Sequence, residues 1–168
     1  MNILKNNIIK ILFGVLIFTS FSSCDEGGNP NPGGTTTEVF AGDWYITSKN
    51  AVGVTLSESA LHSTYNTSAN DNTMWIDDHG NDGASSPSLK CKITMDIANG
   101  TFSAVAQPNV AHTGTVTITE GKIEKGAGKS RGGHTVDKIS FKAVFSNASG
   151  SVLSYEGHKR TGFKEDEY

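Results

Sequence analysis

Residues 89–97 alternate strictly, with five apolar odd-numbered members and four polar even-numbered members. This period of two is typical of a β-strand that buries one face. The pair Asn99-Gly100 follows, and both residues tolerate the positive φ angles of a type I′ turn. We therefore expect a β-hairpin whose return strand is residues 101–106, within a chain of short antiparallel strands.

Weaker alternation predicts further strands along the chain. They cover residues 40–47, 73–77, 115–119, 122–124, 139–145 and 152–160, with a turn at Glu120-Gly121. Together with residues 89–97 and 101–106 these segments give eight strands, and the less regular stretches leave room for one hidden strand. Only residues 56–65, between the first and second strands, have the composition of a helix.

These elements predict an all-β fold, an eight-stranded antiparallel up-and-down barrel with one short helix between strands one and two. Eight strands in this order can close on themselves and leave no unpaired edge. The interior of such a barrel holds side chains or one small ligand. A β-sandwich with a similar number of strands is the alternative, because alternation alone does not distinguish the two.

Residues 1–23 have the pattern of a secretory signal peptide. Lys5 and Lys10 precede an apolar run at residues 11–18, which is far shorter than the roughly 20 residues that span a bilayer. Residues 21–24, Phe-Ser-Ser-Cys, resemble a bacterial lipobox, which implies lipidation of Cys24 after cleavage. An ordinary signal peptide with an incidental cysteine is the alternative.

The segment after Cys24 predicts a tether and an envelope location. Residues 24–38 are rich in Gly, Pro, Asn and Thr, which indicates a flexible linker before a barrel at residues 39–168. The pair Asp25-Glu26 is similar to the acidic signals of some surface lipoproteins. We expect a lipid anchor in the bacterial cell envelope, in the outer membrane, facing the periplasm or the cell surface.

Charge and motif content restrict which binding partners and cofactors are expected. The chain has 14 Lys and Arg against 17 Asp and Glu, a formal net charge of -3, which argues against nucleic acid as a partner. The five histidines show no metal-ligand spacing, so we expect neither a metal nor a cofactor. Cys91 lies on an apolar face and is predicted to be an inert core thiol.

Two residues predict how the barrel closes. Gly42-Asp43-Trp44 on the first strand and Arg160 at the end of the last strand resemble the lipocalin and calycin pattern. That resemblance implies a tryptophan at the barrel base covered by an arginine, a structural plug. Attraction between an arginine and an aromatic face would support this pairing.

A wider resemblance covers most of the chain. Residues 41–45, 68–78 and 157–163 are similar to segments of a family of calycin-type bacterial lipoproteins labelled lipid-binding, putative hydrolase. The resemblance implies a lipocalin-like barrel in the periplasm or on the cell surface. The activity in the label adds little to the case for an enzyme.

The candidates for acid–base chemistry are Asp77, His79 and His158. The run Asp77-Asp78-His79-Gly80 ends a strand and opens a polar loop, so it would lie at a barrel rim. A carboxylate that orients a histidine beside a serine is the general form of an acyl-transfer triad. The sequence has no Gly-x-Ser-x-Gly segment, however, and the serines near His79 lie in irregular sequence.

The inward faces of the predicted strands form the candidate ligand site. Its residues are Leu89, Cys91, Ile93, Met95, Phe102, Phe141 and Phe145, with Ile139 on the same face. They form either a filled core or the lining of an apolar pocket. Small residues at Ala104, Ala106 and Ala143 favour a pocket, whose mouth residues 56–65 would gate.

Three functions remain open. The first is binding of a small apolar, lipid-like ligand inside the barrel by a membrane-anchored lipoprotein. The second is hydrolysis of an ester or lipid with His79 or His158. The third is binding of a protein or glycan at the surface through Tyr45 and Trp75, which are predicted to face outward.

Overall fold

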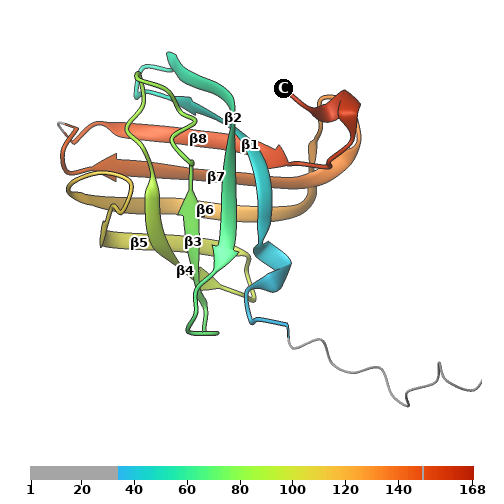
Figure 1. Ribbon diagram of the computed structural model, residues 1–168, viewed down its shortest axis with the longest axis horizontal. Coiled ribbons are helices and arrows are strands. Elements are labelled where there is room, and N and C mark those ends of the chain that lie inside the picture. Colours follow the sequence, from blue (N-terminus) through green and yellow to red (C-terminus); the bar gives the residue numbers. More distant parts are fainter. Residues whose placement is uncertain (1–33, 149) are drawn as a thin grey trace, which may run out of the picture. The chain divides into compact units, whose positions relative to one another are not determined.

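The computed structural model describes residues 34–148 and 150–168, in which eight antiparallel strands form a closed up-and-down barrel (Figure 1). The strands are β1 (Gly42–Lys49), β2 (Thr55–Asn66), β3 (Thr73–Asp77), β4 (Lys90–Asp96), β5 (Thr101–Pro108), β6 (Thr115–Lys129), β7 (Thr135–Phe145) and β8 (Val152–Lys159). Each strand pairs with the next, and β8 pairs with β1. The predicted barrel is therefore confirmed, and the sandwich is excluded.

The folded unit begins before β1. Residues Gly34–Tyr168 form one compact unit, and the short 3-10 helix η1 (Glu38–Phe40) precedes β1. Thr37, which the sequence analysis assigns to the tether, is buried. The predicted signal peptide, Cys24 and residues 24–33 of the tether lie outside the described residues.

The predicted helix at residues 56–65 is wrong, because these residues belong to β2, the strand hidden from the sequence analysis. Ala60, His62 and Thr64 on β2 are buried and face the barrel interior, whereas the residues between them face outward. The inward side chains of β2 are small or polar, so the strand lacks apolar alternation. Pairing with β1 and β3 therefore overrides the local helix preference.

Two predicted turns also differ from the structure. Glu120-Gly121 is an irregularity within β6, where the pairing register shifts and Glu120 has a φ of 53°. A Cβ at Gly121 would lie 2.4 Å from the backbone oxygen of Phe102, so the close approach of β5 requires glycine. The β4–β5 connection is not a type I′ turn, because Gly100 but not Asn99 has a positive φ.

The side chains of the two plug residues point to opposite faces of the sheet, although the Arg160 N–H donates to the carbonyl oxygen of Asp43, next to Trp44, at 2.8 Å. Trp44 is fully buried, and its Nε1 donates a hydrogen bond to Thr64 at 2.9 Å. Lys159 places its ammonium group 5.8 Å from the Trp44 ring, because Trp44 and Lys159 are paired residues whose side chains share one face of the sheet. Arg160, one residue later, points the other way and contacts Asp43.

We expect Trp44→Ala to lower the free energy of unfolding by about 3–5 kcal/mol, because it removes a fully buried aromatic side chain. Arg160→Ala should have little effect, since its ion pairs are exposed to solvent. Urea unfolding followed by circular dichroism measures both variants. An equal loss in the two variants would contradict the separation of their roles.

Candidate functional site

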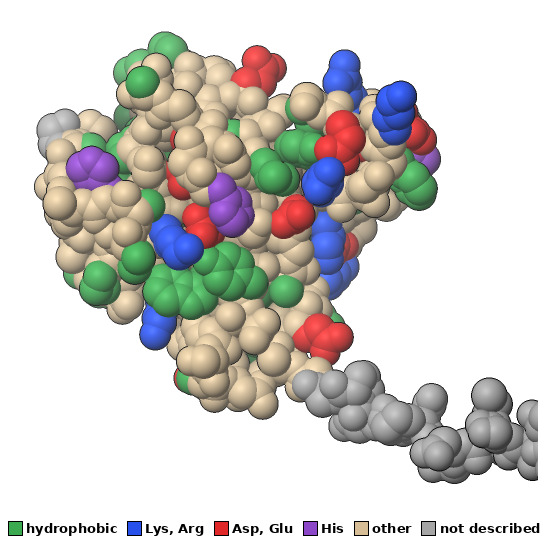
Figure 2. Space-filling view, in the orientation of Figure 1, with side chains coloured by type: hydrophobic (Ala, Val, Ile, Leu, Met, Phe, Trp, Pro, Cys, Tyr) green, Lys and Arg blue, Asp and Glu red, His purple; other side chains and the backbone are tan. Residues whose placement is uncertain are grey.

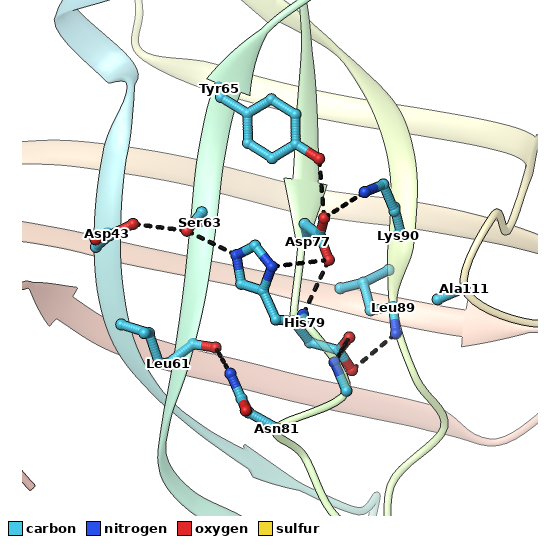
Figure 3. Close-up of polar contacts among 12 residues, drawn as sticks. Asp43, Leu61, Ser63, Tyr65, Asp77, His79, Asn81, Leu89, Lys90 and Ala111 are labelled. Carbon is cyan, nitrogen blue, oxygen red and sulfur yellow. Dashed lines mark hydrogen bonds and ion pairs between the residues drawn. The ribbon is translucent and has the colours of Figure 1, made fainter.

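Four polar side chains form a connected row on the outer face of β1–β3 (Figure 3). Ser63 on β2 donates a hydrogen bond to Asp43 on β1 at 2.6 Å, and its oxygen lies 2.9 Å from Nε2 of His79. Nδ1 of His79 lies 3.7 Å from Asp77. The structure thus brings the predicted residues Asp77 and His79 to Ser63, which sequence analysis missed because it assigned residues 56–65 to a helix.

A tight turn after β3 aims the imidazole of His79 back over β2. His79 and Gly80 have φ angles of 53° and 73°, so both adopt the left-handed conformation. The backbone N–H of His79 donates to Asp77 at 2.9 Å. As a result, the His79 ring lies between Ser63 and Asp77 (Figure 3).

Asp77 is a buried carboxylate that is held in its charged form. Tyr65 donates to it at 2.8 Å, and Nζ of Lys90 lies 2.6 Å away. Burial raises the pKa of Asp77, but Lys90, the His79 N–H and Tyr65 together outweigh burial, so this pKa lies below its ordinary value. In the orientation of Figure 1, this face combines histidine, acidic and basic side chains with hydrophobic ones (Figure 2).

The row contains the residue types of a Ser–His–Asp triad. Its donors and acceptors, however, are not those of a triad, in which the serine donates to the histidine. The hydroxyl proton of Ser63 goes to Asp43, so Nε2 of His79 must donate to Ser63 rather than accept from it. The 3.7 Å contact between His79 and Asp77 is too long for a hydrogen bond. Activation of Ser63 would therefore require its hydroxyl to turn from Asp43 to His79.

A second polar group lies inside the barrel, beneath the loop of residues 78–89 that joins β3 to β4. This loop buries Asp82 and Ser86. Oδ1 of Asp82 lies 3.5 Å from Nε2 of His62 on β2, and Ser86 lies 3.5 Å from the hydroxyl of Tyr155 on β8. Ser48 on β1 pairs with Tyr155 across the sheet, so its side chain faces the same interior. We call Ser48, His62, Asp82, Ser86 and Tyr155 the interior polar cluster.

Three atoms of the interior polar cluster have no hydrogen-bond partner. They are Ser48 Oγ, His62 Nε2 and Asp82 Oδ1, and all three are buried. An unpaired buried polar group costs about 1–3 kcal/mol, so three of them in one cluster are unusual. Two of the three, His62 Nε2 and Asp82 Oδ1, face each other as an ion pair at 3.5 Å.

The charge of His62 depends on the loop. Burial lowers the pKa of His62, but the Asp82 carboxylate, 3.5 Å from Nε2, and the Ala60 carbonyl outweigh burial, so the pKa lies above its ordinary value. Asp78, at the start of the loop, has a pKa raised by burial. Its carboxylate accepts the N–H groups of Gly80 and Leu89, each at 2.8 Å, and so ties the two ends of the loop together.

The predicted ligand-lining residues are all buried in one hydrophobic cluster. This set comprises Leu89, Cys91, Ile93, Met95, Phe102, Phe141 and Phe145. The ring centroids of Phe102 and Phe141 lie 5.8 Å apart, and Phe141 stacks on Tyr155 at 4.5 Å. The aromatic column therefore connects the apolar interior to the interior polar cluster. Ala104 and Ala143 are buried as expected, but Ala106 is exposed because β5 has a register shift there.

A hollow of about 520 Å³ lies on the outer face of the barrel rather than inside it. Its walls are mainly polar side chains of β1, β2 and β6–β8, and they include Lys49, Glu58, Glu120, Lys142 and Glu156. Charged walls of this kind do not suit an apolar guest.

The structure keeps His158 away from the row on β1–β3. Its Nε2 lies 3.3 Å from the hydroxyl of Tyr168 in the C-terminal tail, which includes the 3-10 helix η2 (Lys164–Asp166). The same tail covers Tyr45, whose hydroxyl donates to Glu167 at 2.5 Å. The predicted exposure of Tyr45 is therefore wrong, whereas Trp75 is half-buried on the outer face.

Cys91 is a buried free thiol. Burial raises the pKa of the Cys91 thiol to about 12, as expected for an inert core residue. Within residues 34–148 and 150–168, no three His, Cys, Asp or Glu side chains are grouped so that they could hold a metal ion. In the same residues, no helix has the length and hydropathy needed to cross a membrane.

A closed barrel in which each of eight strands pairs with the next belongs to the class of antiparallel up-and-down β-barrels. Residues 29–164 match the family described as lipid-binding putative hydrolase. The match covers most of the chain, so this protein belongs to that family. A search of the curated proteins finds no match.

We expect the stability of the barrel to fall as the pH rises through the titration of His62. The raised pKa of His62 contributes stability that is fully present below pH 6.5, its ordinary value, and lost above its pKa in the folded chain. His62→Gln should flatten this part of the profile, measured by urea unfolding at a series of pH values. His112→Gln, which changes an exposed histidine, is the control and should leave the profile unchanged. Equal profiles for wild type and His62→Gln would refute the contact with Asp82.

Proposed function

We propose that this protein binds one lipid-like molecule inside its barrel and is held at a bacterial membrane by a lipid anchor on Cys24. The observation that carries the proposal is the arrangement of the interior, in which a continuous apolar core ends in the interior polar cluster. An amphipathic molecule has the same division into an apolar body and a polar end. Membership of a lipid-binding family supports the same function.

Binding would require the loop of residues 78–89 to move. The interior side chains pack in one buried cluster, so a guest needs space that the closed barrel fills. Displacement of Asp82 and Ser86, both contributed by the middle of this loop, would open the end of the barrel next to the interior polar cluster. Burial of the guest's apolar surface would favour the complex by about 25 cal/mol per Å².

The anchor and the location remain part of the proposal. Cys24 follows a short apolar run and precedes a segment rich in Gly, Pro and Thr, a pattern that favours a tethered lipoprotein. Its acyl chains, rather than the formal charge of -3, would supply the membrane affinity. We place the protein at the bacterial outer membrane, on either its periplasmic or its outer side.

We expect a lipid-like molecule to co-purify with the protein. The full chain carrying Cys24→Ser, which leaves the barrel unchanged, would be purified without detergent and measured by native mass spectrometry. A bound mass at a one-to-one ratio, lost after organic extraction, is the expected result. A mass of the chain alone, unchanged after exposure to a panel of neutral and anionic lipids, would reject the proposal. It would favour a protein or glycan partner at Trp75 instead.

Ester hydrolysis is a second candidate function, favoured by the contact of Ser63 with His79 beside Asp77. In this case Ser63 would be the nucleophile, His79 the base and Asp77 the residue that orients His79. Asp43 would restrain the reaction, because it holds the hydroxyl proton of Ser63.

For this candidate, we expect Ser63→Ala and His79→Ala to reduce turnover of a 4-nitrophenyl ester by roughly 10²-fold or more. Asp43→Ala should raise turnover, because it frees the Ser63 hydroxyl for His79. Ser103→Ala, an exposed serine on β5, is the matched control and should behave as wild type. Wild-type turnover at the rate of the buffer alone would exclude hydrolysis of this ester class at the row.

A further inference from the structure

The interior polar cluster also restricts the chemistry of the guest. On the basis of the proposed function, we infer that the polar end of the bound lipid is an uncharged hydroxyl group, as in a long-chain alcohol, and not a carboxylate. The hydroxyl would lie among Ser48, His62 and Asp82, beneath the loop of residues 78–89.

The unpaired atoms of the cluster match a hydroxyl group. Nδ1 of His62 lies 3.0 Å from the carbonyl oxygen of Ala60 and donates its proton there, which leaves Nε2 as an acceptor when the ring is neutral. Oδ1 of Asp82 faces this Nε2 at 3.5 Å, where neither atom completes a hydrogen bond, and the Ser48 hydroxyl is unpaired. A hydroxyl both donates and accepts, so it can pair with Asp82 or His62 and with Ser48 at once.

The charges of the cluster disfavour an anionic group. Asp78 and Asp82 are both buried at this end of the barrel, and His62 is the basic side chain that faces them. No lysine or arginine is buried anywhere in residues 34–148 and 150–168. A carboxylate here would lose its hydration and lie near two aspartates, with His62 as the buried basic side chain that faces them.

The loop of residues 78–89 is suited to act as the cover of this site. Its ends are fixed, because Asp78 bonds the Leu89 N–H at 2.8 Å and Asn109 donates to the oxygen of Ser88 at 2.8 Å. Asn81 also donates to the oxygen of Leu61 on β2 at 2.9 Å, but beyond Asn81 the contacts to the barrel are longer, at 3.5 Å from Asp82 to His62 and 3.5 Å from Ser86 to Tyr155. The middle of the loop can therefore lift while its ends stay in place.

The test compares two probes that share a chain length and differ in the polar end, 1-dodecanol and dodecanoate. Binding to the full chain carrying Cys24→Ser is measured by isothermal titration at about pH 8, where a free carboxylate is ionised. We expect dodecanol to bind at least about tenfold more tightly than dodecanoate, a difference of roughly 1.4 kcal/mol. Tighter or equal binding of dodecanoate overturns the inference and leaves the proposed function intact. Failure of both probes to bind counts against the proposed function itself.

Two aspartate variants test whether Asp82 causes the preference for dodecanol over dodecanoate. Asp82→Asn removes one buried negative charge while keeping the shape of the side chain, so dodecanoate should bind more tightly and the preference for the alcohol should shrink. Asp71→Asn is the matched control, because Asp71 is exposed in the β2–β3 connection, and it should keep the wild-type preference. An unchanged preference in Asp82→Asn would overturn the inference. If Asp82→Asn does not fold, the comparison of dodecanol with dodecanoate on the chain that keeps Asp82 still tests the inference.

Discussion

The pairing of β1 with β8 is the contact on which the rest of the structure depends. Residue pairs from Trp44 with Lys159 to Lys49 with Ser154 join the first and last strands. Without this pairing, the sheet would have two free edges, and its apolar face would be open to water on one side. Closure converts the alternation of each strand into an inside and an outside of one barrel. It also brings the C-terminal tail over β1, where it covers Tyr45.

The barrel wall separates two groups of the same residue types. Outside, Ser63 and His79 lie beside Asp77 on a face where Lys90 and Tyr65 stabilise the charged carboxylate. Inside, His62 lies near Asp82 and Ser86 among buried side chains, and none of the buried side chains in the described residues is a lysine or an arginine. Solvent and countercharges make the outer group a network of satisfied contacts, whereas burial leaves the inner group with unpaired atoms. Burial therefore makes the inner group the better candidate for recognition of a guest.

Much of the fold could be predicted because alternation of apolar and polar residues along the sequence indicates a β-strand with one buried face. Residues 73–77 and the strand at residues 89–97 are found close to their observed bounds. β2 was missed because its inward residues are Ala60, His62 and Thr64, so its buried face is not apolar. The site was predicted only in part for the same reason. Asp77 and His79 stood out in the sequence, but Ser63 and His62 gain their roles from β2.

The sequence by itself determined that the chain forms short antiparallel strands with one apolar face, because that pattern is local and repeats every two residues. It also contained the tryptophan that the barrel buries at its base. Only the tertiary structure decided which polar residues meet. Ser63 and His79 are separated by 16 residues, and Ser86 and Tyr155 by 69. Their contacts depend on strand register and bulges, and a slip of one residue would move every side chain of a strand to the opposite face.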